Sequence, residues 1–93
     1  MSKDITGSNR ELLWIISIVI SANRKLKGLS QEQFADIVGV SRSLISAIEA
    51  PRLAYNFTLD VFFNIANALE IPPDVLLREA SRNILYQDSE KDS

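Results

Sequence analysis

The stretch that decides the fold is QEQFADIVGVSRSLISAIEA, residues 31–50. It holds two short amphipathic segments separated by Gly39. Their apolar residues recur at spacings of one, three and four, which is typical of helices that pack on one face. These residues are Phe34, Ala35 and Val38 in the first segment and Leu44, Ile45 and Ile48 in the second. Gly39 takes a left-handed conformation at little cost, so the chain can turn tightly between two helices.

Each predicted helix follows a residue that can cap it. Ser30 precedes the first helix, and Gln33 three positions later completes the pattern of a capping box. Ser41 can cap the second helix in the same way. Ala35 is small at the point where two steeply crossing helices have to touch. Together these features predict a helix-turn-helix unit, and the second helix of such a unit can enter the major groove of DNA.

The positions 34, 35, 38, 39, 40, 45 and 48 resemble the helix-turn-helix of the lambda-repressor-like family, the XRE or Cro/C1 type. A bare helical hairpin can show the same two segments, but here the resemblance continues beyond the unit. The stretch TLDVFFNIANALEIPPDVLL, residues 58–77, is similar to the family's fourth helix, apolar turn and fifth helix. The resemblance covers about residues 16–77 and implies an all-α fold. We therefore expect a five-helix lambda-repressor-like DNA-binding domain with an extended C-terminal helix.

Composition excludes several classes of function. The 93 residues suit one small domain, and 46% are hydrophobic, which is enough for a core. The chain has no cysteine and no histidine, so it lacks disulfides, thiolate metal ligands and the usual general base. We expect neither an enzyme nor a cofactor. The apolar run at 12–22 is shorter than a membrane-spanning helix and lacks signal-peptide flanks, so we expect a cytoplasmic protein that does not engage a membrane.

Charge is distributed unevenly around a net value of −2. Residues 23–52 carry five cations against three anions, whereas residues 53–93 carry three cations against seven anions. The basic part is the part that contains the helix-turn-helix unit. This asymmetry agrees with DNA on that side of the domain and another partner elsewhere.

The chain divides into four predicted parts. Residues 1–8 are a flexible arm, and residues 9–77 form the domain, with the helix-turn-helix at 31–50. Residues 78–86 continue as a helical extension that serves dimerisation, because Leu77, Ala80, Ile84 and Leu85 fall at helical spacing. Residues 87–93 are polar and are expected to be a disordered tail.

The first helix, about residues 9–26, is apolar on more than one face. Leu13, Ile16 and Ile20 suit the core, which leaves Trp14 and Ile18, together with Ile15, on a second face. Such a helix must be covered on both sides, either by another element of the chain or by another subunit.

The resemblance also assigns residues to DNA. It places Arg42, Ser43 and Ala47 at base edges, and Ser46 lies on the same outward row of the second helix. Arg42 can bind a guanine bidentately, although a phosphate contact or a solvated cation remains an alternative. The positions expected to face phosphates are Gln31, Ser41, Arg52 and Asn56, where the alternative for Gln31 is a solvated side chain. In the family, residues at the positions of Arg24 and Glu49 form a structural pair.

These expectations describe a sequence-specific, double-stranded DNA-binding transcriptional regulator, most often a repressor. It would act as a homodimer on a pseudo-palindromic operator, since one recognition helix reads too few base pairs. The candidate dimer residues are Trp14, Ile18, Phe63, Leu77, Ile84 and Leu85. The alternative is a protein–protein interaction module on the same fold, such as an antitoxin or adaptor, whose partner is a second protein.

Overall fold

The computed structural model describes residues 7–50, 53 and 56–92, without the side chains of residues 7, 8 and 83–92. This part of the chain contains five helices and no strand. The helices are α1 (Gly7–Leu26), α2 (Gln31–Val38), α3 (Arg42–Glu49), α4 (Leu59–Leu69) and α5 (Pro73–Asp92). The all-α, five-helix prediction is therefore confirmed.

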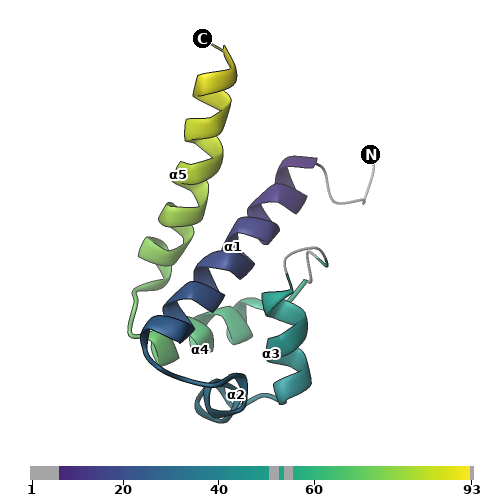
Figure 1. The fold of residues 1–93 in the computed structure, drawn as a ribbon, viewed down its shortest axis with the longest axis vertical. Coiled ribbons are helices and arrows are strands. Elements are labelled where there is room, and N and C mark those ends of the chain that lie inside the picture. The colour runs from purple at the N-terminus through teal and green to yellow at the C-terminus, as the bar shows by residue number, and fades with distance from the viewer. Residues whose placement is uncertain (1–6, 51–52, 54–55, 93) are drawn as a thin grey trace.

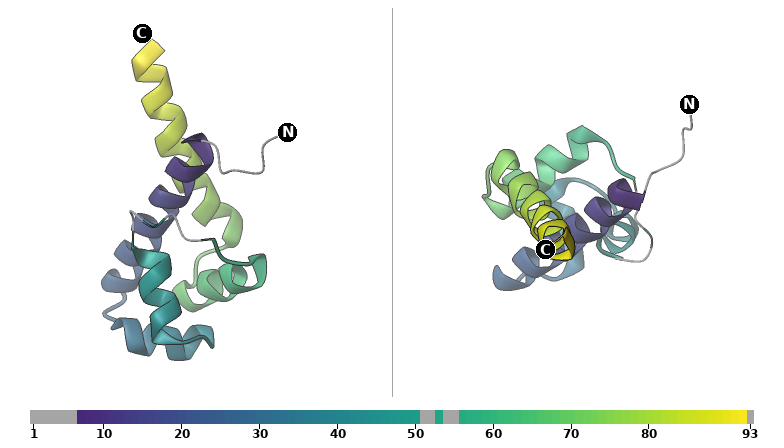
Figure 2. Two further views of the ribbon diagram at one scale, coloured as in Figure 1. Left: turned by 90° about the vertical axis from the view of Figure 1, so that its right-hand side faces the viewer. Right: turned by 90° about the horizontal axis from the view of Figure 1, so that it is seen from above.

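The two long helices form one end of the molecule and the helix-turn-helix forms the other (Figure 1). α5 runs beside α1, and its C-terminal half extends past the rest of the domain (Figures 1 and 2). α4 lies behind α1 in the view of Figure 1, and α2 and α3 complete the opposite end. No helix in the described ranges is both long enough and apolar enough to cross a bilayer.

The predicted caps are present around the helix-turn-helix. Ser30 Oγ accepts a hydrogen bond from the Gln33 backbone N–H at 3.0 Å, and Gln33 Oε1 accepts from the Ser30 N–H at 2.9 Å. Ser41 Oγ accepts from the Leu44 N–H at 3.1 Å. Gly39 ends α2 with φ 88°, the left-handed value that the tight turn requires. Local sequence patterns thus determine where α2 and α3 begin and turn.

One apolar core joins all five helices. Its fully buried large side chains come from every helix, which explains why the short α2 and α3 are stable although eight-residue helices are marginal alone. These side chains are Phe34, Ile20, Ile45, Ile48, Ile65, Leu69 and Leu76.

The buried face of α1 differs from the sequence-based prediction. Leu13 lies outside the core cluster, whereas Ile15 packs against it. Ser17, one of the two serines inside the apolar run at 12–22, is only 3% exposed, and its hydroxyl donates to the Trp14 carbonyl at 2.6 Å. α1 packs against α3, α4 and α5. A helix with several neighbours can bury a small polar residue whose hydroxyl the helix itself satisfies.

The first turn of α4 also differs. The helical spacing of Leu59, Phe62 and Leu69 would place all three in the core, but Leu59 is 68% exposed. Phe57, just before the Thr58 cap, packs against the core instead, and its ring centroid lies 6.3 Å from that of Phe62. An apolar residue before the cap therefore supplies the contact expected from the first residue of the helix.

α5 is longer than predicted. The sequence suggested a disordered tail from residue 87, but the backbone is helical to Asp92. No glycine or proline follows Pro73, and polar helix formers such as glutamate and lysine give the helix no strong stop signal. At the other end, α1 begins at Gly7, inside the expected arm, and residues 1–6 lie outside the described residues.

Candidate nucleic-acid interface

α3 is anchored through one face and presents the other to solvent. Ile45 and Ile48 are buried at 0% and 1% exposure. On the opposite side Arg42, Ser43 and Ser46 are exposed, and Ala47 is half-buried. The helix can therefore enter a groove without giving up any contact with its own core.

The outward row consists of one long cation among small side chains. The Arg42 guanidinium has no hydrogen-bond or ion-pair partner among the described residues. Ser41 at the start of the row already accepts a hydrogen bond as the cap of α3, but its hydroxyl hydrogen can still be donated to an anion. Small residues let a helix approach base edges closely, while Arg42 alone has the reach for bidentate recognition.

The Arg24–Glu49 pair expected from the family resemblance is present. Arg24 Nε donates to Glu49 Oε2 at 2.7 Å and Nη2 donates to Oε1 at 3.0 Å, in a two-bond arrangement. The third nitrogen, Nη1, donates to the Leu29 carbonyl at 2.6 Å. Arg24 is 8% and Glu49 7% exposed, so the pair lies inside the domain. It joins the end of α1, the connection before α2 and the last turn of α3.

Gln31 makes a contact that the sequence did not indicate. Its amide Nε2 donates to Glu49 Oε1 at 3.1 Å. Gln31 is the first residue of α2, where backbone N–H groups lack intrahelical acceptors and attract anions. Sequence patterns give no signal for this bond because the two residues are eighteen positions apart, on different helices.

The remaining predicted phosphate residues lie on the connection between α3 and α4. Asn56 is exposed two residues before the Thr58 cap of α4. Arg52 lies outside the described residues, so its predicted contact has no structural description here. Among the described residues no group of acidic side chains could hold a metal ion.

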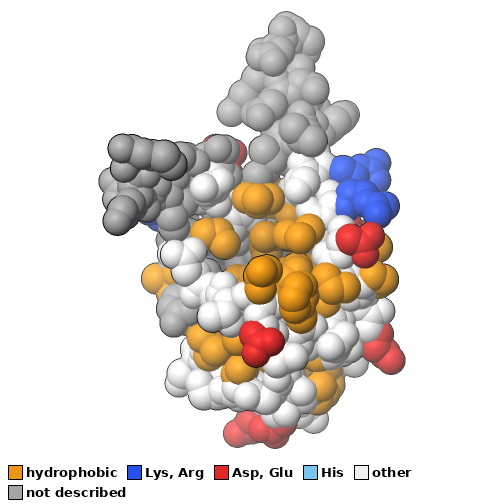
Figure 3. Space-filling model, turned by 180° about the vertical axis from the view of Figure 1, so that it is seen from behind, with side chains coloured by type: hydrophobic (Ala, Val, Ile, Leu, Met, Phe, Trp, Pro, Cys, Tyr) orange, Lys and Arg blue, Asp and Glu red, His pale blue; other side chains and the backbone are white. Residues whose placement is uncertain are grey.

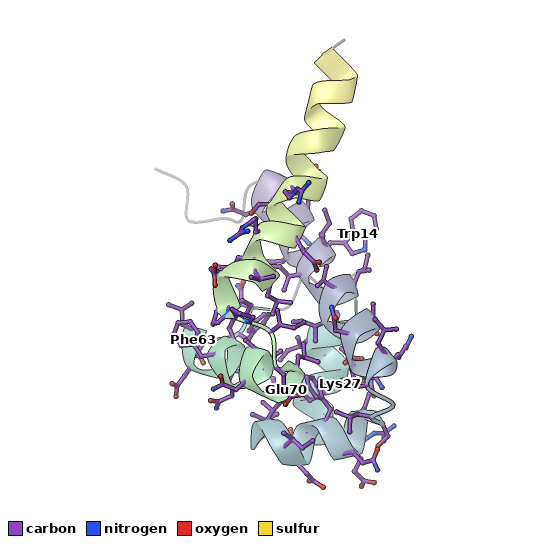
Figure 4. The ribbon with its side chains drawn as sticks, turned by 90° about the vertical axis from the view of Figure 1, so that its left-hand side faces the viewer. Trp14, Lys27, Phe63 and Glu70 are labelled. Carbon is purple, nitrogen blue, oxygen red and sulfur yellow. The ribbon has the colours of Figure 1, made fainter. Side chains whose placement is uncertain are left out.

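The predicted dimer residues do not form one surface. Trp14 and Ile18, four residues apart on α1, are 48% and 44% exposed, and we call them the α1 face. Leu59 and Phe63, four apart on α4, are 68% and 45% exposed, and we call them the α4 face. Figure 4 shows Trp14 and Phe63 pointing to opposite sides of the molecule.

Apolar side chains gather in the middle of the surface seen from behind, where α4 lies (Figure 3). Leu77 of α5 is 40% exposed and is also available for a contact. Ile84 and Leu85 lie on the helical part of α5 whose side chains are outside the described residues. Phe63 of the α4 face points toward this same side of the molecule (Figure 4).

The family comparison agrees with this geometry. A family profile described as helix-turn-helix matches residues 20–76, which include the whole of α2, α3 and α4. The chain belongs to the lambda-repressor-like (XRE) helix-turn-helix family of DNA-binding transcription regulators. A comparison with curated proteins gave no match.

Several similar solved structures are restriction-modification controller proteins. Wild-type C.Esp1396I has 33% sequence identity and a TM-score of 0.69, over 81% of this chain and 95% of that chain. C.Esp1396I bound to a 25 base pair operator site has 34% identity and the same TM-score, over 80% and 95%. C.AhdI from Aeromonas hydrophila has 34% identity and a TM-score of 0.63, over 69% and 94%.

Proposed function

We propose that this protein binds a specific double-stranded DNA sequence as a homodimer and thereby regulates transcription. The observation that carries this proposal is the outward row of α3, in which Arg42 has no partner among the described residues while the opposite face is fixed in the core. An unpaired cation at the start of a rigidly held helix suits bidentate recognition of guanine. Repression is the proposed outcome, because a dimer that covers a promoter excludes other proteins from it.

The other residues of the interface have smaller roles in the proposal. Ser43 and Ser46 can bond a base or a phosphate, and Ala47 can offer its methyl group to thymine. Gln31, Ser41, Arg52 and Asn56 flank the helix and are assigned to the sugar–phosphate backbone. Phosphate contacts position the protein and do not read sequence, so specificity rests mainly on the α3 row.

A dimer is proposed because α3 is short. Its eight residues span about 12 Å, which covers only a few base pairs. Two-fold dimers place two such helices about 34 Å apart, on successive turns of the groove. The operator-bound structure of C.Esp1396I contains a 25 base pair site, which is consistent with more than one recognition helix.

The α4 face, with Leu77, is the proposed dimer surface. Phe63 points to the side of the molecule where apolar side chains gather (Figures 3 and 4), and Leu59 lies one turn before it on α4. Burial of such a surface drives association. The α1 face on the opposite side gives the alternative function its support. Trp14 is half-exposed there, and a second protein could cover it if the chain were an antitoxin or adaptor.

The test is a salt titration of binding to a random-sequence DNA pool, followed by sequencing of the bound fraction. We expect an enriched inverted repeat with half-sites about one helical turn apart, and log affinity that falls steeply with log salt. The variant Arg78→Ala should give the same enriched sequence and the same affinity as the wild type, because Arg78 is an exposed arginine on α5 that pairs with Asp74. Weak binding without any enriched sequence would contradict the proposal and favour the alternative, a module that binds a second protein.

A further inference from the structure

We propose that Glu49 is a positioning residue for DNA binding, because it holds the amide of Gln31 in place before DNA arrives. The proposal rests on the proposed function, in which Gln31 meets a phosphate. It adds a role for a buried carboxylate that does not itself touch DNA. The same carboxylate that pairs with Arg24 accepts the Gln31 amide, so one group organises both the fold and the contact surface.

The Glu49 carboxylate binds three donors from two residues. Oε2 accepts from Arg24 Nε at 2.7 Å, while Oε1 accepts from Arg24 Nη2 at 3.0 Å and from Gln31 Nε2 at 3.1 Å. The Glu49 side chain is only 4% exposed, so water competes little for these positions. The two-bond pairing with Arg24 fixes the carboxylate plane, and the fixed plane in turn defines where the Gln31 amide lies.

Gln31 keeps donors available after making this bond. A primary amide has two N–H groups, and the bond to Glu49 uses one of them. The second amide N–H remains, and so does the backbone N–H of the first residue of α2, which has no intrahelical acceptor. Two donors on one residue at the positive end of a helix are suited to a phosphate oxygen.

Holding the amide in advance improves binding because a glutamine side chain otherwise loses rotamer freedom when it contacts DNA. Immobilising a side chain at an interface costs enough to change affinity by about 2- to 10-fold. Because of the bond to Glu49, the Gln31 side chain is already ordered in the folded protein before DNA binds. It also ties the start of α2 to the last turn of α3, so phosphate and base contacts are presented by one rigid unit.

The test removes the anchor while keeping the domain folded. Glu49→Gln alone leaves the buried Arg24 without its charged partner, which can unfold the domain. The paired replacement Arg24→Met with Glu49→Met is preferable, because apolar residues of similar size often substitute for a buried ion pair. Binding to the enriched operator is measured for four proteins: wild type, the Met pair, Gln31→Ala, and the Met pair with Gln31→Ala. Thermal unfolding establishes that each is folded.

We expect the Met pair to weaken operator binding about 2- to 10-fold when Gln31 is present, and to cause no further loss when Gln31 is alanine. An equal loss in both backgrounds would overturn the proposal, because the ion pair would then act through the general placement of α3. Unchanged affinity of the Met pair would overturn it as well. Absence of any operator binding by the wild type is a separate result, which contradicts the proposed function itself.

A second measurement needs no variant. The order parameter of the Gln31 side-chain amide is measured by NMR relaxation in the DNA-free wild type. We expect it to approach the backbone value of about 0.85, whereas the exposed Asn64 amide, which has no partner among the described residues, should fall below about 0.6. A Gln31 amide as mobile as that of Asn64 would overturn the proposal even if the Met pair failed to fold.

Discussion

A buried polar cluster and two exposed apolar faces give this molecule two kinds of surface with different tasks. Around the helix-turn-helix, Arg24, Glu49 and Gln31 form a closed hydrogen-bonded cluster. Cap side chains there accept hydrogen bonds from backbone N–H groups at the starts of α2 and α3. On the α1 face and the α4 face, large apolar side chains such as Trp14 and Phe63 remain exposed. The polar cluster is complete within a single chain, whereas the α1 and α4 faces offer surface for a contact with another chain. Recognition needs a rigid presentation and association needs apolar area, so the two tasks call for different surfaces.

The largest effect should come from breaking the closed cluster. Glu49→Ala leaves the Arg24 guanidinium buried without its carboxylate, and we expect a loss of about 3–5 kcal/mol in the free energy of unfolding. Denaturant unfolding measures it. The matched control is Arg78→Ala, which removes an exposed pair with Asp74 at 3.1 Å and should cost only about 0.3–0.5 kcal/mol. Similar losses for the two variants would mean that the helix-turn-helix end does not depend on its internal pairing.

The next effect distinguishes the two apolar faces. Phe63→Ser should weaken the proposed dimer by about 2 kcal/mol or more, roughly 30-fold in the dissociation constant, because an aromatic anchor is lost. Trp14→Ser is the matched control on the opposite side and should leave the dimer intact. Sedimentation equilibrium measures both. A dimer that tolerates Phe63→Ser but dissociates with Trp14→Ser would assign association to the α1 face.

A smaller and more selective effect is expected at the DNA surface. Arg42→Ala should change the free energy of unfolding by less than about 0.5 kcal/mol, because Arg42 has no partner among the described residues. Binding to the intact operator should weaken by about 1–3 kcal/mol, and the variant should lose its preference for the native base at one position only. Competition with single-base operator variants measures this selectivity. A loss that is equal for all sequences would assign Arg42 to the phosphates.

The smallest effect concerns an exposed ion pair that links the end of α1 to the end of α4. A hydrogen bond from Lys27, and the positive charge of Lys27, hold the pKa of Glu70 below its ordinary value of 4.5. A carboxylate with a lowered folded-state pKa stabilises the protein above pH 4.5, and this contribution disappears as the pH falls through the lowered pKa. Glu70→Gln should therefore be slightly less stable than wild type at pH 7 and equally stable in acid.

Thermal unfolding across this pH range measures the Glu70 effect. The control is the same substitution in a Lys27→Met background, where the difference at pH 7 should vanish. If the difference persists without Lys27, the ion pair is not its cause.

Short-range features of the fold were predictable from the sequence. The Ser30 capping box, the left-handed Gly39 and the Ser41 cap each depend on residues within a few positions, and all three are present. Family resemblance added the Arg24–Glu49 pair, which is also present. The assignments of Arg42 and Ser43 to base edges stay predictions, since they require DNA.

Features that depend on how distant helices pack were not predictable. Ser17 is buried in a helix that packs against α3, α4 and α5, and no pattern within α1 encodes where these three helices will lie. The Gln31–Glu49 bond requires the start of α2 to meet the end of α3 at hydrogen-bonding distance. Leu59 is exposed because Phe57 takes the contact at that end of α4.

The anchoring of α3 has a consequence for how such proteins diverge. Ile45 and Ile48 fix the helix from beneath, and the exposed Ser43 and Ser46 take no part in the core. Substitutions at these two serines are therefore expected to cost little stability while they change the chemistry offered to DNA. A duplicated copy of this chain could acquire a new operator through one or two replacements and keep the rest of its structure. The same two positions are therefore the first choice for engineered changes in the DNA sequence that the protein binds.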